Sequence, residues 1–172
     1  LFTDWRDSPR TESVNYLQEL IDFISDKKNV KISSISGRYF AMDRDNNWER
    51  IQKSYDAILG KIEKSNKDPV AYLKQSYSDK VFDEFIEPIY FVSGKAFESG
   101  DVFLHYNYRS DRATQLTKII EKDFWSENIY TMTKYYNEFA WKYFIKKQKV
   151  ENTLWEIISE KWLSQLHIAE TE

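Results

Sequence analysis

Residues 30–51 read VKISSISGRYFAMDRDNNWERI and contain, in order, a β-branched run, a polar loop and an amphipathic segment. The run from Val30 to Ser36 is short and is bounded by polar residues and a glycine, which predicts a strand. A helix is expected from about Asn46, with Asp45 as its N-cap and Gly60 as its end. A strand that runs through a loop into a helix is the repeating unit of α/β folds.

Strand patterns recur on both sides of this stretch. They lie at 1–3, 101–108 and 129–133, and a hairpin is expected over 89–97 with its turn at 93–95. Because strand and helix patterns alternate along the chain, the predicted fold class is α/β: a single domain with a largely parallel central sheet flanked by helices.

Helical periodicity predicts a further helix over 11–25 and another that Ser110 can cap, and a short helix is expected over 70–77 in a less regular region. Near the C-terminus, the pattern Thr153-x-x-Glu156 matches a capping box and predicts a last helix. The apolar residues of this helix that are expected to face inward are Leu154, Ile157 and Ile158.

The composition of the 172 residues is that of a folded domain. Hydrophobic residues make up 41% and charged residues 31%, near the average for globular proteins. A formal net charge of -3 argues against nucleic-acid binding, because affinity for a phosphate backbone needs an excess of Lys and Arg. No apolar run approaches the roughly 20 residues that cross a bilayer. The lack of cysteine excludes disulfides and favours a cytoplasmic location.

Five arginines follow the expected strands. They are Arg6, Arg38, Arg44, Arg109 and Arg112, and Asp7 accompanies the first of them. In open α/β sheets, ligands bind outside the carboxyl ends of the strands, where helix N-termini also offer free N–H groups. Since a guanidinium can hold carboxylate or phosphate oxygens with two parallel hydrogen bonds, the pattern predicts a site for an anion that bears both groups. The alternative is that these arginines form local ion pairs with neighbouring acids on a solvated loop.

Other kinds of site have less support. The two histidines, His105 and His167, lie far apart and have no carboxylates at metal-ligand spacing, so a strand-facing or surface role is expected and no metal ligand is predicted. The four glycines stand alone, which excludes a glycine-rich phosphate loop.

One motif is specific enough to indicate a family. The run Ser36-Gly37-Arg38-Tyr39-Phe40-Ala41-Met42-Asp43-Arg44-Asp45, followed by Trp48-Glu49-Arg50, resembles the cofactor-independent phosphoglycerate mutases. Shorter matches follow in the same order at 2–7, 83–85, 107–113, 132–135 and 168–172. The resemblance spans nearly the whole chain and is weakest at 60–80 and 136–150.

The resemblance implies that residues 1–172 are most of the substrate-binding transferase domain of a two-domain enzyme, truncated at both ends. Members of this family interconvert 3-phosphoglycerate and 2-phosphoglycerate, a glycolytic isomerisation that passes through a phosphoserine intermediate. The nucleophilic serine and two Mn²⁺ ions would belong to a phosphatase domain of the same protein, of the alkaline phosphatase superfamily, that is absent from this chain. The chain alone is therefore expected to hold the glycerate and to be inactive.

The resemblance also assigns roles to residues. The positions that correspond to substrate-binding ones are Arg6, Asp7, Arg38, Arg44, Arg109 and Arg112, which include all five arginines found above. The arginines would hold carboxylate and phosphate, while Asp7 would contact the glycerate hydroxyls and assist proton transfer.

Two other functions stay open at this point. A non-catalytic anion-binding module would use the same arginines without any reaction. A related phosphomutase or phosphatase of the alkaline phosphatase superfamily would act on another phosphorylated metabolite. Substrate profiling that sets 3-phosphoglycerate against sugar phosphates distinguishes the last alternative.

Three tryptophans, Trp5, Trp155 and Trp162, stand where the resembled family has glycine, and the chain has only 4 glycines. These substitutions lead to the hypothesis that the gene uses the codon UGA for glycine and that it was read as tryptophan. The alternative for Trp155 and Trp162, seven residues apart on one expected helix, is an ordinary apolar stripe.

Overall fold

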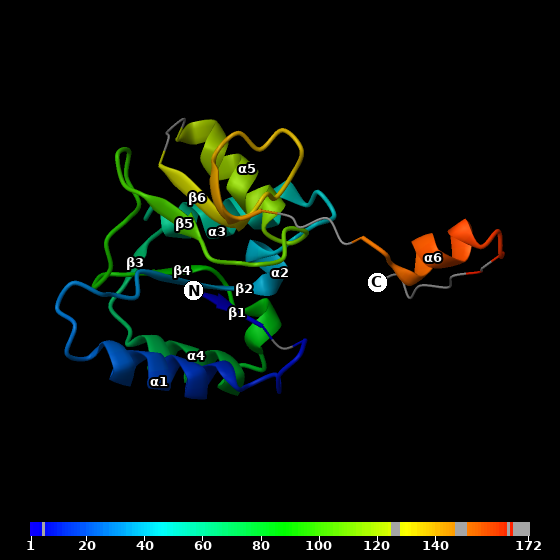
Figure 1. The fold of residues 1–172 in the computed structure, drawn as a ribbon. Coiled ribbons are helices and arrows are strands. Elements are labelled where there is room, and N and C mark those ends of the chain that lie inside the picture. Colours follow the sequence, from blue (N-terminus) through cyan, green and yellow to red (C-terminus); the bar gives the residue numbers. More distant parts are fainter. Residues whose placement is uncertain (5, 125–127, 147–150, 165, 167–172) are drawn as a thin grey trace.

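The computed structural model describes residues 1–4, 6–124, 128–146, 151–164 and 166 (Figure 1). Within them the chain forms six α-helices, one 3₁₀ turn and seven short strands, which confirms the predicted α/β class. The match at 168–172 and His167 lie outside the described residues, as does Trp5. In the described part of the chain, no helix is both long and apolar enough to cross a membrane.

The strands form two sheets. The first has the order β1-β2-β4-β3 and contains β1 (Phe2–Thr3), β2 (Ser34–Gly37), β4 (Ile89–Phe91) and β3 (Lys64–Ser65). The second contains β5 (Phe103–His105), β6 (Ile129–Thr133) and β7 (Lys142–Ile145). All pairings are parallel except that of β2 with β4, so the sheet is largely parallel as predicted, although it is divided into two hydrogen-bonded parts.

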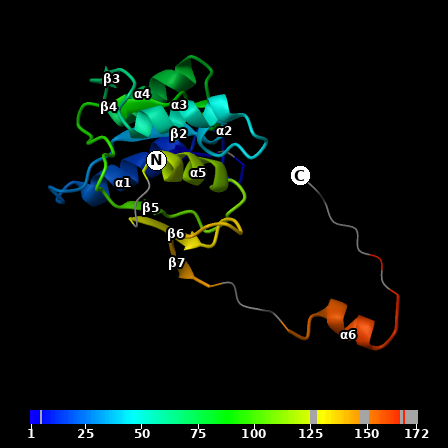
Figure 2. The ribbon, with the colours of Figure 1, turned by 90° about the horizontal axis from the view of Figure 1, so that it is seen from above.

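The described residues also form six helices. They are α1 (Ser13–Ile24), α2 (Arg38–Ala41), α3 (Trp48–Ile58), α4 (Pro69–Ser78), α5 (Thr114–Asp123) and α6 (Leu154–Glu160), and the 3₁₀ turn η1 spans Asp83–Phe85. Figure 1 shows α1 and α4 on one side of the four-stranded sheet and α3 and α5 on the other. Figure 2, turned by 90°, shows β5, β6 and β7 beyond α5.

Each side of the molecule has its own core. Between the first sheet and the helices α1 and α4, the buried residues are Leu17, Ile35, Val70, Leu73, Ile86 and Phe91. Between α3, α5 and the second sheet they are Ile51, Tyr55, Leu116, Ile120, Ile129 and Phe139. The helices predicted at 11–25 and 46–60 thus bury the faces that their periodicity indicates, and the short helix expected over 70–77 is present as α4. Gly60 ends α3 with a φ of +61°.

The hairpin expected over 89–97 is wrong. The strand β4 ends at Phe91, and a turn follows in which the N–H of Gly94 donates to the carbonyl of Phe91 at 3.0 Å. The strands β2 and β3 already occupy both edges of β4, so β4 offers no edge to a returning strand.

Two helix caps also differ from expectation. The N-cap of α3 is Asn47 rather than Asp45. Before α5, Ser110 acts through its main-chain carbonyl, which accepts the N–H groups of Ala113 and Thr114 at 3.1 and 3.0 Å. Both helix starts are therefore organised by contacts that the local pattern of polar residues does not reveal.

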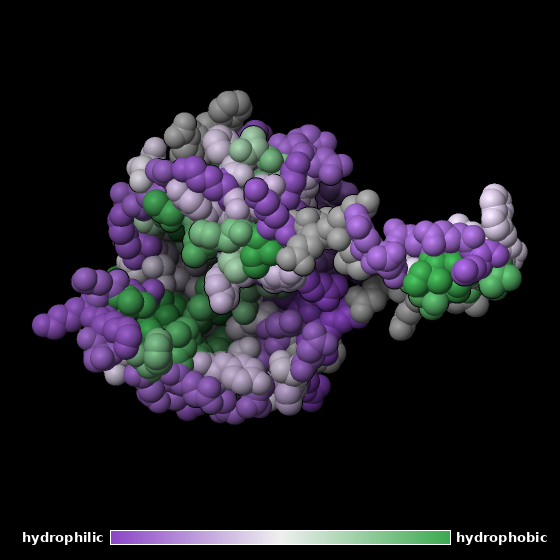
Figure 3. All heavy atoms as spheres, viewed as in Figure 1, coloured by the Kyte–Doolittle hydropathy of each residue, from purple (hydrophilic) through white to green (hydrophobic). Residues whose placement is uncertain are grey.

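The capping box at the start of α6 is confirmed. The hydroxyl of Thr153 accepts the N–H of Glu156 at 3.3 Å, and the Glu156 carboxylate accepts the N–H of Thr153 at 2.9 Å. The inward orientation of Leu154, Ile157 and Ile158 is wrong, since no residue of the described helix is buried and Leu154 is 68% exposed. Figure 3 shows apolar side chains lying open on this helix, away from the layered body.

Trp162 follows α6 with a φ of +56°, in the left-handed region. Its N–H donates to the carbonyl of Ser159 at 3.0 Å, and the N–H of Leu163 donates to the carbonyl of Ile158 at 3.2 Å. This is the Schellman pattern, in which glycine is the favoured residue at the left-handed position. The backbone at Trp162 therefore suits glycine, as the hypothesis of a misread UGA codon requires. The structure at Trp155 favours neither the misread codon nor an apolar stripe.

We expect Trp162→Gly to stabilise α6 by about 1 kcal/mol, because the left-handed conformation costs a residue with a side chain roughly that much. Hydrogen exchange of the α6 amides measures the effect. Trp155→Gly is the matched control: Trp155 is the second residue of α6, where the backbone is right-handed, so glycine there should lower protection, by up to about 1 kcal/mol. A loss of protection in both variants would contradict the glycine hypothesis at position 162.

His105 in β5 has the strand-facing role that the sequence predicts. The residue is 4% exposed, and its ring packs against the rings of Phe2, Phe103 and Tyr135, with centroids 5.5 to 6.2 Å away. Its Nδ1 lies 2.8 Å from the hydroxyl oxygen of Thr117. Burial lowers the pKa of His105 to about 4.

This pKa predicts a loss of stability in mild acid. Because the pKa of the folded state lies below the ordinary 6.5, the unfolded chain binds the proton more tightly between these two values. As the pH falls from 6.5 to 4, His105 should reduce the free energy of unfolding by about 3 kcal/mol. Urea denaturation at several pH values checks this, and His105→Gln should flatten the dependence. An unchanged dependence in the variant would refute the assignment.

Candidate functional site

Arginines from three separate segments line one cavity. Strands β1 and β2 are parallel, with Thr3 opposite Gly37, so Arg6 and Arg38 leave the sheet at the same edge. Arg112 comes from the loop before α5. Together with Glu84 of η1, these side chains line a cavity of about 250 Å³. The structure thus brings together three of the five arginines that the sequence singled out.

Arg38 is held in a fixed position. It is 7% exposed, and its Nη1 donates to Oδ1 of Asp4 at 2.6 Å. The same oxygen accepts the main-chain N–H of Arg6 at 2.9 Å. A buried guanidinium needs such a partner, since its charge would otherwise be costly to remove from water. Asp4 therefore ties together the two segments that carry Arg6 and Arg38.

Gly37 allows β2 to end directly against η1. Its N–H donates to the carbonyl of Ile86 at 2.7 Å. A Cβ added at this position would lie 2.2 Å from the carbonyl oxygen of Glu84 and 2.6 Å from the nitrogen of Ile86. Only glycine fits this close approach of two backbones, which places Arg38 and Glu84 at the same cavity.

The turn η1 is anchored by Asp83, whose side chain is fully buried. The carboxylate accepts the N–H of Ser13 at 3.0 Å and the hydroxyl hydrogen of Tyr77, and the carbonyl accepts the hydroxyl of Thr3 at 2.6 Å. Burial raises the pKa of Asp83, although the hydrogen bonds from Tyr77 and Ser13 oppose this. These contacts fix η1 to β1, α1 and α4.

The guanidinium groups repel one another. Burial, followed by the charges of Arg38 and Arg44, lowers the pKa of Arg112. Its Nη1 donates to the carbonyl of Met42 at 3.1 Å. A cluster of positive charges held in this way is stabilised by an anion, which is the electrostatic property expected of a carboxylate or phosphate site.

Asp43 organises the loop that carries Arg44, a role that no sequence motif predicted. The carboxylate is buried and accepts the N–H groups of Asp45 and Asn47 at 3.0 and 2.9 Å, and Nη1 of Arg50 at 3.3 Å. Burial raises its pKa, but the hydrogen bonds from Asn47 and Asp45 and the charge of Arg50 lower it overall. The only signal in the sequence is the alternation of acid and arginine around Arg44.

The remaining predicted residues lie beside the cavity. Nη1 of Arg44 lies 3.4 Å from one oxygen of Asp111, and Nε of Arg109 lies 3.7 Å from the other. The Arg109 side chain is 81% exposed and lines a neighbouring cleft of about 1060 Å³ near the ends of β6 and β7. Asp7 is exposed and is not among the described residues that line the arginine cavity. Arg44 and Arg109 thus form ion pairs with a neighbouring acid, as the alternative interpretation of the arginine pattern predicts.

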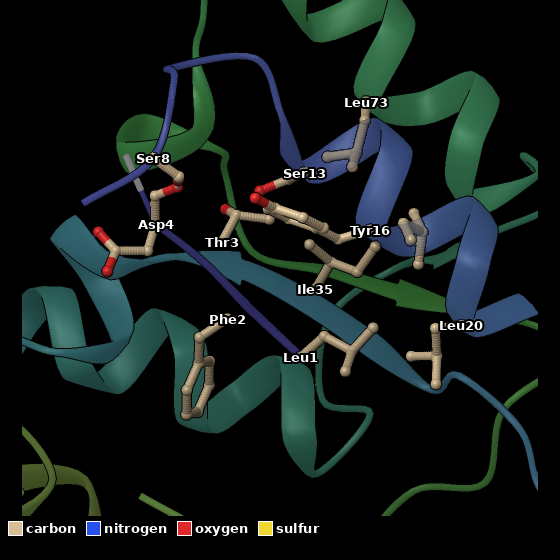
Figure 4. Close-up of a pocket in the computed structure, with 11 residues that line it drawn as sticks. Leu1, Phe2, Thr3, Asp4, Ser8, Ser13, Tyr16, Leu20, Ile35 and Leu73 are labelled. Atoms are coloured by element: carbon tan, nitrogen blue, oxygen red, sulfur yellow. Dashed lines mark hydrogen bonds between the residues drawn. The ribbon is translucent and has the colours of Figure 1, made fainter. Parts of the chain in front are cut away.

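A further cavity of about 220 Å³ lies between β1 and α1. Figure 4 shows that Leu1, Leu20, Ile35 and Leu73 supply much of its wall, while the Asp4 carboxylate points away from them. Such a surface offers few hydrogen-bond donors, so it does not suit an anion.

We expect Gly37→Ala to lower the free energy of unfolding by about 2 to 3 kcal/mol, because the new Cβ would overlap backbone atoms that cannot move independently. Gly100→Ala is the matched control. Gly100 has a φ of +95° and nothing within 4 Å of an added Cβ, so only backbone strain of about 1 kcal/mol is expected. Urea denaturation followed by circular dichroism compares the two variants. An equal loss of unfolding free energy in Gly37→Ala and Gly100→Ala would show that the contact between Gly37 and η1 is not tight.

Guanidinium groups that meet at the carboxyl ends of parallel strands are the arrangement expected of an α/β domain that binds anions. The chain belongs to the family described as BPG-independent PGAM N-terminus (iPGM_N), whose model matches residues 1–138.

Proteins named 2,3-bisphosphoglycerate-independent phosphoglycerate mutase are similar over the whole chain. The one from Sulfurimonas denitrificans is 39% identical over 180 residues, and the one from Helicobacter hepaticus is 40% identical over 182 residues. Each alignment covers 100% of this chain and 36% of the relative. The chain thus spans about a third of the length of these relatives.

A solved structure has the same fold. A crystal structure of Leishmania mexicana phosphoglycerate mutase at low cobalt concentration superposes with a TM-score of 0.76 at 20% identity. The match covers 91% of this chain and 33% of that chain. This likeness supports the α/β architecture described above.

Proposed function

We propose that this chain binds the glycerate part of a phosphoglycerate and is the substrate-binding portion of a 2,3-bisphosphoglycerate-independent phosphoglycerate mutase. The observation that carries the proposal is the cavity lined by Arg6, Arg38 and Arg112. A phosphoglycerate bears a carboxylate at one end and a phosphate at the other. Planar guanidinium groups bind both kinds of oxygen with paired hydrogen bonds.

In this proposal Arg38 is the least mobile of the arginines that contact the ligand, because its ion pair with Asp4 and the contact of Gly37 with η1 hold it in place. Arg44 and Arg109 exchange their ion pairs with Asp111 for oxygens of the bound ligand. Asp7, which is exposed beside Arg6, takes part in proton transfer to or from a glycerate hydroxyl.

We further propose that the longer protein catalyses the glycolytic interconversion of 3-phosphoglycerate and 2-phosphoglycerate through a phosphoserine, in the cytoplasm. The phosphoryl group would leave the substrate for a serine of the phosphatase domain and return to the other glycerate hydroxyl, while this chain keeps the glycerate in place. The two Mn²⁺ ions would act in that domain. The described residues of this chain contain no group of three or more His, Cys, Asp or Glu side chains that could hold a metal ion, so we assign them no metal.

A calorimetric titration tests this proposal: 3-phosphoglycerate is titrated into the unmodified chain and into the variant Arg112→Ala, and the two affinities are compared. Loss of a charge-assisted hydrogen bond costs roughly 1.5 to 3 kcal/mol, so the variant should bind about 10 to 100 times more weakly. Arg10→Ala is the matched control: its guanidinium stacks on Phe82, 4.2 Å from the ring centroid, and should not affect binding.

Two outcomes would contradict the proposal. Equal binding by Arg112→Ala and the unmodified chain would mean that Arg112 only supports the loop at Met42. Tighter binding of a sugar phosphate than of 3-phosphoglycerate would favour the related phosphomutase or phosphatase instead.

A further inference from the structure

Arg112 depends on one main-chain oxygen for its position in the arginine cavity. Its Nη1 donates to the carbonyl of Met42 at 3.1 Å, and this is the only hydrogen bond that its side chain makes to another described residue. Arg38, in contrast, is held by an ion pair with Asp4. The orientation of the Met42 carbonyl therefore decides where the Arg112 guanidinium lies.

Met42 stands at the end of the helix α2. Its N–H still donates to the carbonyl of Arg38 at 2.9 Å, as in a helix, and its φ of -124° and ψ of 31° then turn the chain away. The last carbonyls of a helix have no partner within it and accept hydrogen bonds from outside. The carbonyl of Met42 is available to Arg112 for this reason, and it stays so only if the following residues do not continue the helix.

Asp43, the next residue, fixes the chain beyond this point. One carboxylate oxygen accepts the N–H groups of Asp45 and Asn47 at 3.0 and 2.9 Å, and the other accepts Nη1 of Arg50 at 3.3 Å. N–H groups that are bonded to a side chain are not available for helical hydrogen bonds, so the loop does not extend α2. Arg50 belongs to α3 and lies 3.9 Å from the ring centroid of Tyr39 in α2, so the carboxylate connects the loop to both helices.

We propose that Asp43 is a positioning residue for anion binding, which orients Arg112 through the main-chain carbonyl of Met42. The inference rests on the proposed function of the arginine cavity. Asp43 is 4% exposed and is not among the described residues that line this cavity, so it acts through Arg112 and not on the ligand. Its contribution is preorganisation: the guanidinium is in place before the ligand arrives, which reduces the entropy lost on binding.

The direction of the effect distinguishes positioning from simple electrostatics. Removal of a negative charge near an anion site should strengthen the binding of an anion, because one repulsion is lost. Loss of the contacts that hold the Met42 carbonyl should weaken binding instead. The two mechanisms therefore predict opposite changes of affinity when Asp43 is replaced by a neutral residue.

The test is a double-mutant cycle. Calorimetry measures the affinity for 3-phosphoglycerate of the unmodified chain, Asp43→Ala, Arg112→Ala and the double variant. We expect Asp43→Ala to weaken binding about tenfold when Arg112 is present, and about threefold or less when it is absent, because the group to be positioned is then missing. Asp43→Asn keeps a neutral acceptor for the loop, so its affinity should stay within about threefold of that of the unmodified chain.

Asp45→Ala is the matched control. Asp45 is exposed and lies two residues from Asp43, and its main-chain N–H, which bonds the Asp43 carboxylate, is retained in the variant. The substitution removes one negative charge near the site without removing a contact of Asp43. Its affinity should stay within about twofold of that of the unmodified chain, since exposed charges are screened. Thermal unfolding without ligand verifies that each variant is folded at the temperature of the titration.

A second measurement needs no ligand. NMR relaxation of the Arg112 side chain should show larger motion on the picosecond to nanosecond timescale in Asp43→Ala than in the unmodified chain, and no change in Asp45→Ala. If the unmodified chain does not bind 3-phosphoglycerate, the proposed function fails, and the relaxation measurement decides whether Asp43 positions Arg112. Tighter binding by Asp43→Ala, equal weakening with and without Arg112, or unchanged motion of Arg112 would each overturn the inference.

Discussion

The close contact between Gly37 and the turn η1 is the constraint on which the rest of the site depends. Two backbones approach there to a distance that excludes even a methyl group. Since Arg38 follows Gly37 directly and Glu84 lies in η1, this contact sets the spacing between a cation and an anion across the cavity. The buried Asp83 then transmits the position of η1 to β1 and α1, so the cavity is attached to the core rather than to a loose loop.

Carboxylates that contact the arginines or their loops hold the arginine site in position. Asp4 fixes Arg38, Asp43 fixes the loop of Arg44, and Asp111 connects Arg44 with Arg109. Each acid offsets part of the repulsion between guanidinium groups in the absence of a ligand. The three inner arginines nevertheless remain at one cavity, where burial and mutual repulsion lower the pKa of Arg112. An anionic ligand relieves this repulsion, which is the energetic basis of recognition by such a cluster.

Local patterns predicted the helices of this chain better than its strands. Periodicity identified α1, α3 and α5, because the apolar face that packs an amphipathic helix is encoded within one segment of the sequence. The strands β3 and β7 have no such signal, since two to four residues are too few to show alternation and their pairing depends on distant partners. The orientation of α6 also could not be read from its apolar residues, because periodicity indicates that a face is apolar but not what covers it.

The sequence by itself determined the α/β class, the family and the set of arginines, since these depend on residue types and their order along the chain. Only the tertiary structure decided which arginines meet, that Glu84 joins them and that Asp7 and Arg109 stay outside the cavity. The physical reason is that convergence depends on long-range pairing: β1 lies beside β2, and η1 lies against Gly37, across separations of more than 30 residues.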